Sequence, residues 1–120
     1  DDDVRNIFAM TNVLELKGAK ALIARNGREA LEKIEKQSEI DLVLMDIMMP
    51  EMDGLEAMRR IRSGSANSDI PIIAITAKAM PGYNEKCLKA GANDYLAKPV
   101  DIDKLMSLIK VWLPKNLVLR

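Results

Sequence analysis

Short apolar runs alternate along the chain with longer segments in which apolar residues recur at helical spacing. The runs at 42–45 and 72–75 contain no polar residue, which is typical of strands that are buried on both faces of a parallel sheet. Residues 20–24 and 94–97 indicate two further, shorter strands. The pattern therefore predicts at least four strands that are separated by helices.

Five segments show the amphipathic spacing of helices. They are residues 4–17, 28–36, 55–62, 83–90 and 101–112. Asp3 is a suitable cap for the first helix, Asn26 caps the second, and Pro114 stops the last. The helix at 83–90 has few large apolar residues, so we expect it to be mobile or to face a partner.

The alternation of strands and helices predicts an α/β fold with a doubly wound parallel sheet. The length of 120 residues fits one domain spanning residues 1–120. In such sheets ligands bind at the carboxyl ends of the strands, near the point where the strand order reverses. Functional residues are therefore expected directly after the apolar runs.

Charge and composition exclude several classes of protein. Eighteen basic residues balance eighteen acidic ones, so the chain lacks the positive surplus of a general nucleic-acid binder. No apolar run approaches the roughly 20 residues of a membrane span, and the acidic residues 1–3 are unlike a signal peptide. The single Cys87 fits a reducing compartment, so we expect a cytoplasmic protein.

The chain contains no histidine. This absence excludes Ser-His-Asp and Cys-His catalysis within the chain, and it also excludes most zinc sites. A phosphohistidine relay would therefore need a second protein to supply the histidine.

Three polar residues, Asp46, Thr76 and Lys98, follow the apolar runs, and Asp1 and Asp2 open the chain. Each residue alone is more often a turn, strand-end or loop residue. Together they converge on one sheet edge, where clustered carboxylates repel one another unless a divalent cation lies among them. Oxygen ligands with room for water suit Mg²⁺. The group therefore predicts a site that accepts a phosphoryl group on a carboxylate.

Three separated motifs carry a family resemblance: LVLMDIMMPEMDG at 42–54, ITA at 75–77 and GANDYLAKP at 91–99. In this order and spacing they closely resemble the receiver domain of two-component response regulators. The likeness is nearest to the receivers of hybrid sensor histidine kinases, and it covers residues 1 to about 112. It implies a flavodoxin-like parallel sheet of five strands in the order 2-1-3-4-5, with five helices.

The resemblance also implies roles for the acidic residues and the lysine. Asp46 matches the phosphoacceptor, and Lys98 matches the lysine that pairs with the phosphate. Asp1 and Asp2, together with Asp46 and the backbone carbonyl of Met48, match the ligands of Mg²⁺.

Two further residues match the family's switch. Thr76 corresponds to the switch hydroxyl, and Tyr95 corresponds to the aromatic ring that rotates on activation. The bond between Lys98 and Pro99 corresponds to a peptide bond that is cis in this family.

The implied function is that of a phosphorelay receiver in signal transduction. Asp46 would take the phosphoryl group from phosphohistidine on a histidine kinase or a histidine phosphotransfer protein. The aspartyl phosphate would then change the face formed by residues 83–90, 94–97 and 101–112, which would control an output partner protein or domain. Such a domain phosphorylates and dephosphorylates itself but is no independent turnover enzyme. No nucleic acid or membrane is expected to take part.

The chain departs from the family at its beginning. A receiver opens with an apolar strand before its acidic pair, whereas the acids here are the first residues. The apolar residues 117–119 follow the last helix, so we expect residues 116–120 to fill the first-strand position between 20–24 and 42–45. This arrangement would be a circular permutation, natural or engineered, in a monomer or in a strand-swapped dimer. A frayed tail or a truncated chain are the alternatives.

Other functions stay open. A phosphatase of the haloacid-dehalogenase type needs a second aspartate where this chain has Met48. A flavin-binding module would need a phosphate cradle that the loops lack. A docking or dimerisation module of receiver fold that cannot be phosphorylated is the main alternative.

Overall fold

The computed structural model describes residues 2–36, 39–47, 52–64, 69–76 and 82–113. Within these residues it contains five helices and four strands. The first and last residues of each differ by at most three positions from those of a predicted segment. In chain order they are α1 (Asp2–Leu16), β1 (Ala21–Ala24), α2 (Gly27–Lys36), β2 (Leu42–Ile47), α3 (Met52–Ser63), β3 (Ile72–Thr76), α4 (Tyr83–Ala90), β4 (Asp94–Ala97) and α5 (Ile102–Trp112). No helix in this part of the chain is long and apolar enough to cross a membrane.

Side-chain caps explain where two of the helices begin. Asn26 Oδ1 accepts a hydrogen bond from the backbone N–H of Glu29 at 2.9 Å, as expected for the cap of α2. Asp101 Oδ1 accepts one from the N–H of Lys104 at 3.2 Å at the start of α5. Asp3 was expected to cap the first helix, but α1 already begins at Asp2, so that prediction is wrong.

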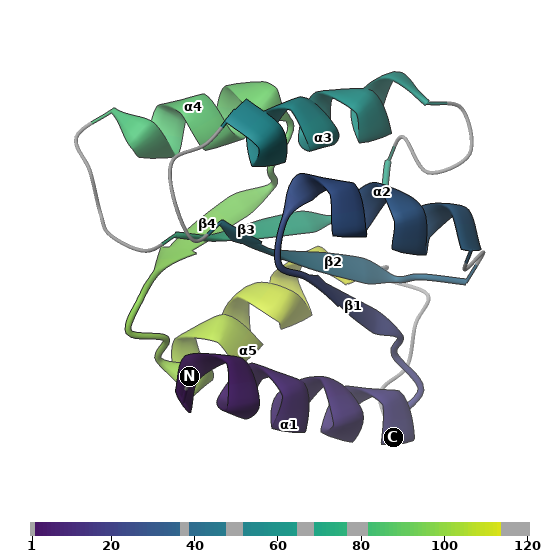
Figure 1. The fold of residues 1–120 in the computed structure, drawn as a ribbon. Helices are drawn as coiled ribbons and strands as arrows, with labels where there is room; N and C mark the ends of the chain where they lie inside the picture. Colours follow the sequence, from purple (N-terminus) through teal and green to yellow (C-terminus); the bar gives the residue numbers. More distant parts are fainter. Residues whose placement is uncertain (1, 37–38, 48–51, 65–68, 77–81, 114–120) are drawn as a thin grey trace.

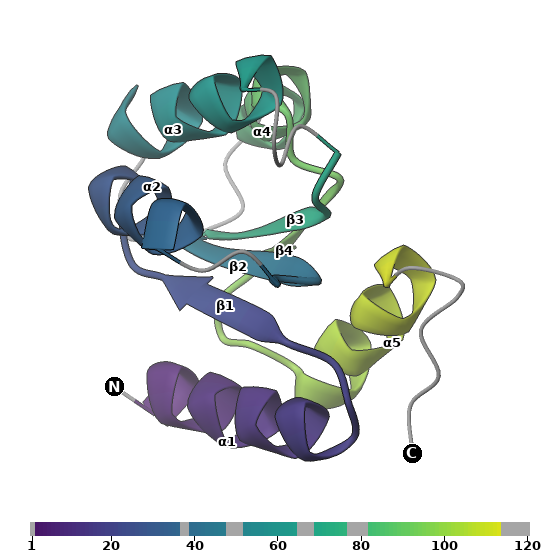
Figure 2. The same ribbon diagram turned by 90° about the vertical axis from the view of Figure 1, so that its right-hand side faces the viewer.

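The four described strands form one parallel sheet in the order β1-β2-β3-β4. Three helices, α2, α3 and α4, cover one face, and α1 and α5 cover the other (Figures 1 and 2). This arrangement is the doubly wound α/β architecture that the alternation of elements predicts.

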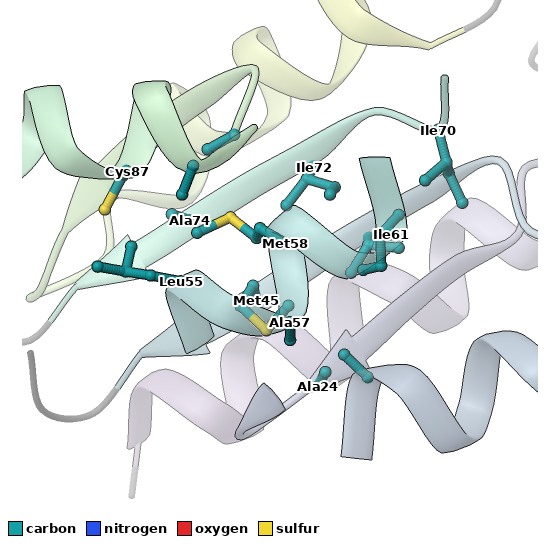
Figure 3. Packing of buried hydrophobic residues seen from close by; sticks show 14 of the residues in the cluster. Ala24, Met45, Leu55, Ala57, Met58, Ile61, Ile70, Ile72, Ala74 and Cys87 are labelled. Atoms are coloured by element: carbon teal, nitrogen blue, oxygen red, sulfur yellow. The ribbon is translucent and has the colours of Figure 1, made fainter. Parts of the chain in front are cut away.

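Each face of the sheet has its own hydrophobic core. Val43 and Met45 of β2 face α2, α3 and α4, where Met58 and Cys87 are fully buried. Figure 3 shows this cluster between the sheet and the helices. On the other face Leu44 packs with residues of α1 and α5. Alternate residues of one strand are therefore buried on opposite faces, which explains why the sequence of this strand is apolar without interruption.

The expected position of residues 116–120 between the first two strands is wrong. β1 pairs directly with β2 along its whole length, from Ala21 opposite Leu42 to Ala24 opposite Met45. Because β2 gives its hydrogen bonds on that side to β1, no further strand fits between them. Residues 116–120 themselves lie outside the described residues, and a circular permutation is not shown.

Candidate functional site

Asp46 lies near the carboxyl end of β2, opposite Ile75 of β3. Only 2% of its surface is exposed. A carboxylate at such a depth loses most of its hydration and needs a positive or hydrogen-bonding partner.

Lys98 supplies that partner. Its Nζ donates a hydrogen bond to Asp46 Oδ2 at 3.3 Å and lies 3.3 Å from Oδ1. The lysine directly follows β4, and its backbone N–H donates to the carbonyl of Thr76 at 2.8 Å. The peptide bond between Lys98 and Pro99 is cis. The sheet register therefore brings two side chains that are 52 residues apart into one buried ion pair.

Two buried oxygen atoms at this edge have no hydrogen-bond partner among the described residues. They are Oδ1 of Asp46 and Oγ1 of Thr76, which is the last residue of β3 and is 2% exposed. Buried polar atoms normally have a hydrogen-bond partner, and an exception calls for a reason such as a bound ligand. The edge is therefore suited to a ligand that brings both positive charge and polar groups.

Tyr95 and Thr76 lie on neighbouring strands and on the same face of the sheet. Tyr95 pairs with Ala74, two residues before Thr76, and side chains two apart share a face. Tyr95 is half-buried against the cluster on the side of α3 and α4. A change at Thr76 thus has a short route to Tyr95 and to α4.

The predicted metal ligands fall mostly outside the described part of the chain. Asp1 and Met48 are outside it, and Asp2 is described only as the first residue of α1. Among the described residues no group of three acidic, histidine or cysteine side chains could hold a metal ion. Because α1 leads by a short turn into β1, it begins on the side of the sheet where the strands end (Figure 1).

Sequence reasoning missed one residue, Arg62, at the end of α3. Its guanidinium donates hydrogen bonds to the carbonyls of Gly91 and Ile70 and to Asn93 Oδ1, at 2.6–2.9 Å. Burial lowers the pKa of Arg62, and the charge of Asp69 opposes that effect. These contacts lie at the start of β3, whereas Asp46 lies near the end of β2. They are therefore at the other end of the parallel strands from Asp46.

The decisive comparison is with models of protein families. The sequence model of the family described as response regulator receiver domain matches residues 1–110. The chain belongs to the response regulator receiver domain family. The predicted resemblance is therefore confirmed.

The receiver is also similar to a curated hybrid kinase. It is 40% identical over 114 residues to the signal transduction histidine-protein kinase BarA of Escherichia coli (strain K12). The match covers 95% of this chain but 12% of BarA. The chain thus spans about an eighth of the length of that relative.

Two solved structures share the fold. The receiver domain of sensor histidine kinase PA1611 from Pseudomonas aeruginosa PAO1, with a magnesium ion coordinated in its active site cleft, is 37% identical with a TM-score of 0.68. That match covers 89% of this chain and 87% of the other. A second match is a co-crystal structure of a Saccharomyces cerevisiae histidine phosphotransfer signaling protein with the receiver domain of its downstream response regulator. It gives 27% identity, a TM-score of 0.72 and coverage of 98% and 88%. The flavodoxin-like receiver fold is therefore confirmed.

Proposed function

We propose that this receiver accepts a phosphoryl group from phosphohistidine onto Asp46. The observation that carries the proposal is the buried Asp46–Lys98 pair at the carboxyl edge of the sheet, with Thr76 at the end of the neighbouring strand β3. Because the chain has no histidine, the donor is a separate histidine kinase or histidine phosphotransfer protein, or another domain of a larger protein. The co-crystal structure named above, of a phosphotransfer protein with a receiver domain, supports such a donor.

The attacking atom is a carboxylate oxygen of Asp46, and Lys98 Nζ lies 3.3 Å from both of these oxygens. The oxygen attacks phosphorus, a new P–O bond forms, and the bond between phosphorus and the histidine nitrogen breaks with its electron pair left on that nitrogen. The ammonium of Lys98 stabilises the negative charge of the phosphoryl group as it joins Asp46. Positioning and electrostatic stabilisation of this kind dominate phosphoryl transfer in general.

The oxygen donors of this edge suit magnesium. Asp46, Asp1, Asp2 and the backbone carbonyl of Met48 would hold the ion, as the family resemblance implies. Asp46 Oδ1, which accepts no hydrogen bond from the residues that the structure describes, fits that role, because hard cations take carboxylate and carbonyl oxygens. Magnesium, when bound, would supply positive charge next to the transferring group.

The phosphorylated state would engage Thr76. Its Oγ1–H would donate a hydrogen bond to a phosphoryl oxygen, since it has no acceptor among the described residues. Moving Thr76 frees space on the face that it shares with Tyr95, so the ring can follow and alter the surface near α4 and β4. A local charge thus biases a two-state switch that an output partner can read.

The experiment is to incubate the protein with a small phosphodonor and magnesium and to measure the intact mass over time. We expect the gain of one phosphoryl group, followed by its slow loss to water, and no gain when magnesium is removed by a chelator. No mass change in either condition would favour a docking module that is not phosphorylated. Steady hydrolysis of unrelated phosphomonoesters would favour a phosphatase instead.

A further inference from the structure

Arg62 joins three parts of the chain where the strands begin, at the end of the sheet away from Asp46. From the last turn of α3, Nε and Nη2 donate to the carbonyl of Gly91 at 2.9 and 2.7 Å. Nη1 donates to the carbonyl of Ile70 at 2.6 Å, and Nη2 also donates to Asn93 Oδ1 at 2.7 Å. Such charge-assisted bonds are stronger than neutral ones, and the planar guanidinium fixes their directions.

These contacts hold the C-terminal end of α4. The N–H of Ala92 donates to the carbonyl of Cys87 at 3.0 Å, and the N–H of Asn93 donates to the carbonyl of Ile72 at 2.7 Å. Gly91 has φ of +126°, and a Cβ atom there would lie 2.7 Å from Arg62 Cγ. The turn after α4 is therefore packed against the arginine side chain and bonded to β3.

The N-terminal end of α4 is preceded by a glycine. Gly82 adopts φ of 80°, and its carbonyl accepts a long hydrogen bond from the N–H of Lys86 at 3.3 Å. α4 begins on the side of the sheet where β3 ends, and it ends on the opposite side (Figure 1). One end of α4 is thus near the phosphorylation site, and the other is clamped far from it.

We propose that Arg62 and Gly91 form a pivot for α4. On phosphorylation of Asp46 the helix turns about its clamped C-terminal end, so its displacement is greatest near Gly82 and smallest at Gly91. Arg62 is a positioning residue in this account, since it acts through the helix and does not touch the reacting atoms. The inference rests on the proposed phosphorylation of Asp46.

The test is an NMR comparison of backbone amide shifts before and after adding magnesium and fluoroberyllate, which mimics a phosphoryl group on a carboxylate. In the unmodified chain we expect the shift changes along α4 to be several-fold larger at residues 82–86 than at residues 90–93. Arg62→Lys keeps the charge but loses the planar fork, and should raise the changes at residues 90–93 to the level of the other end. Arg60→Lys is the matched control, because the Arg60 side chain is exposed and its guanidinium pairs with Glu56 of the same helix.

Two results would overturn the pivot. The first is a uniform profile, or one that is largest at Gly91, in the unmodified chain while the amides of Thr76 and Lys98 respond. The second is an Arg62→Lys profile that equals that of the unmodified chain. If the amides of Thr76 and Lys98 do not respond to fluoroberyllate at all, the proposed function of Asp46 fails, and the pivot fails with it.

Discussion

At the scale of single residues, the two side chains of the Asp46–Lys98 pair differ in their exposure to water. The Asp46 side chain is 2% exposed, whereas the Lys98 side chain is 13% exposed. A lysine can extend its flexible stem so that the ammonium reaches water, but a short carboxylate that ends inside the sheet cannot. The stability of the fold should therefore depend more on the cation than on the anion.

Lys98→Ala should lower the free energy of unfolding by about 1–3 kcal/mol, because it leaves a buried carboxylate without its donor. Asp46→Asn keeps the shape of the side chain and removes the charge, so it should change stability much less. Urea unfolding of both variants and the parent measures the difference. A larger loss of unfolding free energy in Asp46→Asn than in Lys98→Ala would contradict the expectation that stability depends more on the cation.

Thr76→Val should leave stability unchanged or raise it by up to about 1 kcal/mol, because the buried hydroxyl that it removes has no hydrogen-bond partner in the described part of the chain. The same variant should lose the response of Tyr95 to phosphorylation. Thermal unfolding checks the first expectation and Tyr95 fluorescence or NMR the second. A marked loss of stability would show that Thr76 Oγ1 is already bonded in the resting protein.

At the scale of elements, the ends of α3 and α4 depend on Arg62. Its guanidinium serves Gly91, Ile70 and Asn93, which follow α4 or precede β3. Because burial lowers the pKa of this arginine, the charge is held at a cost in hydration that the hydrogen bonds offset.

Arg62→Met should lower the free energy of unfolding by about 2–4 kcal/mol, because it leaves three partly buried acceptors without this donor. Arg60→Met removes an exposed arginine from the same helix and should cost no more than about 0.5 kcal/mol. Denaturant unfolding of the two variants gives the comparison directly. Similar values for both would mean that the Arg62 contacts do not hold α4 to the sheet.

The sequence predicts the elements well where one physical rule dominates. The runs at 42–45 and 72–75 are apolar throughout because both faces of β2 and β3 are covered, and Gly91 marks the end of α4 because the chain there needs a positive φ. The candidate site is likewise predictable, since residues that follow parallel strands meet at one edge.

Other features leave no local signal in the sequence. The bonds from Arg62 to Gly91 and Asn93 join residues 29 and 31 positions apart, and nothing near Arg62 indicates them. The direct pairing of β1 with β2 was also missed. The apolar residues 117–119 and the family's strand order favoured a strand between them, whereas periodicity cannot decide which strands are neighbours.

At the scale of the whole molecule, two cores hold the helices to the sheet, and α4 contributes small residues to one of them. Cys87 is 0% exposed and Ala90 is 2% exposed. Burial raises the pKa of the Cys87 thiol, so the reactive thiolate is scarcer than in an exposed cysteine at the same pH.

Alkylation of Cys87 by a thiol reagent should therefore be many-fold slower in the folded protein than in urea. Its increase with pH should also begin at a higher pH, because the folded thiol deprotonates later. Rates measured by mass spectrometry across a pH series, with and without urea, test both points. Equal rates in the two states would mean that α4 does not protect Cys87.

Mapping the phosphorylated residue tests the central claim most directly. An aspartyl phosphate reacts with hydroxylamine to give a hydroxamate, which marks the modified carboxyl group permanently. After treatment with a small phosphodonor, magnesium and hydroxylamine, the account predicts a hydroxamate on Asp46 in the fragment spectrum of its peptide, and none in Asp46→Asn. A hydroxamate on Asp41, Asp53 or another carboxylate, persisting in Asp46→Asn, would contradict the account.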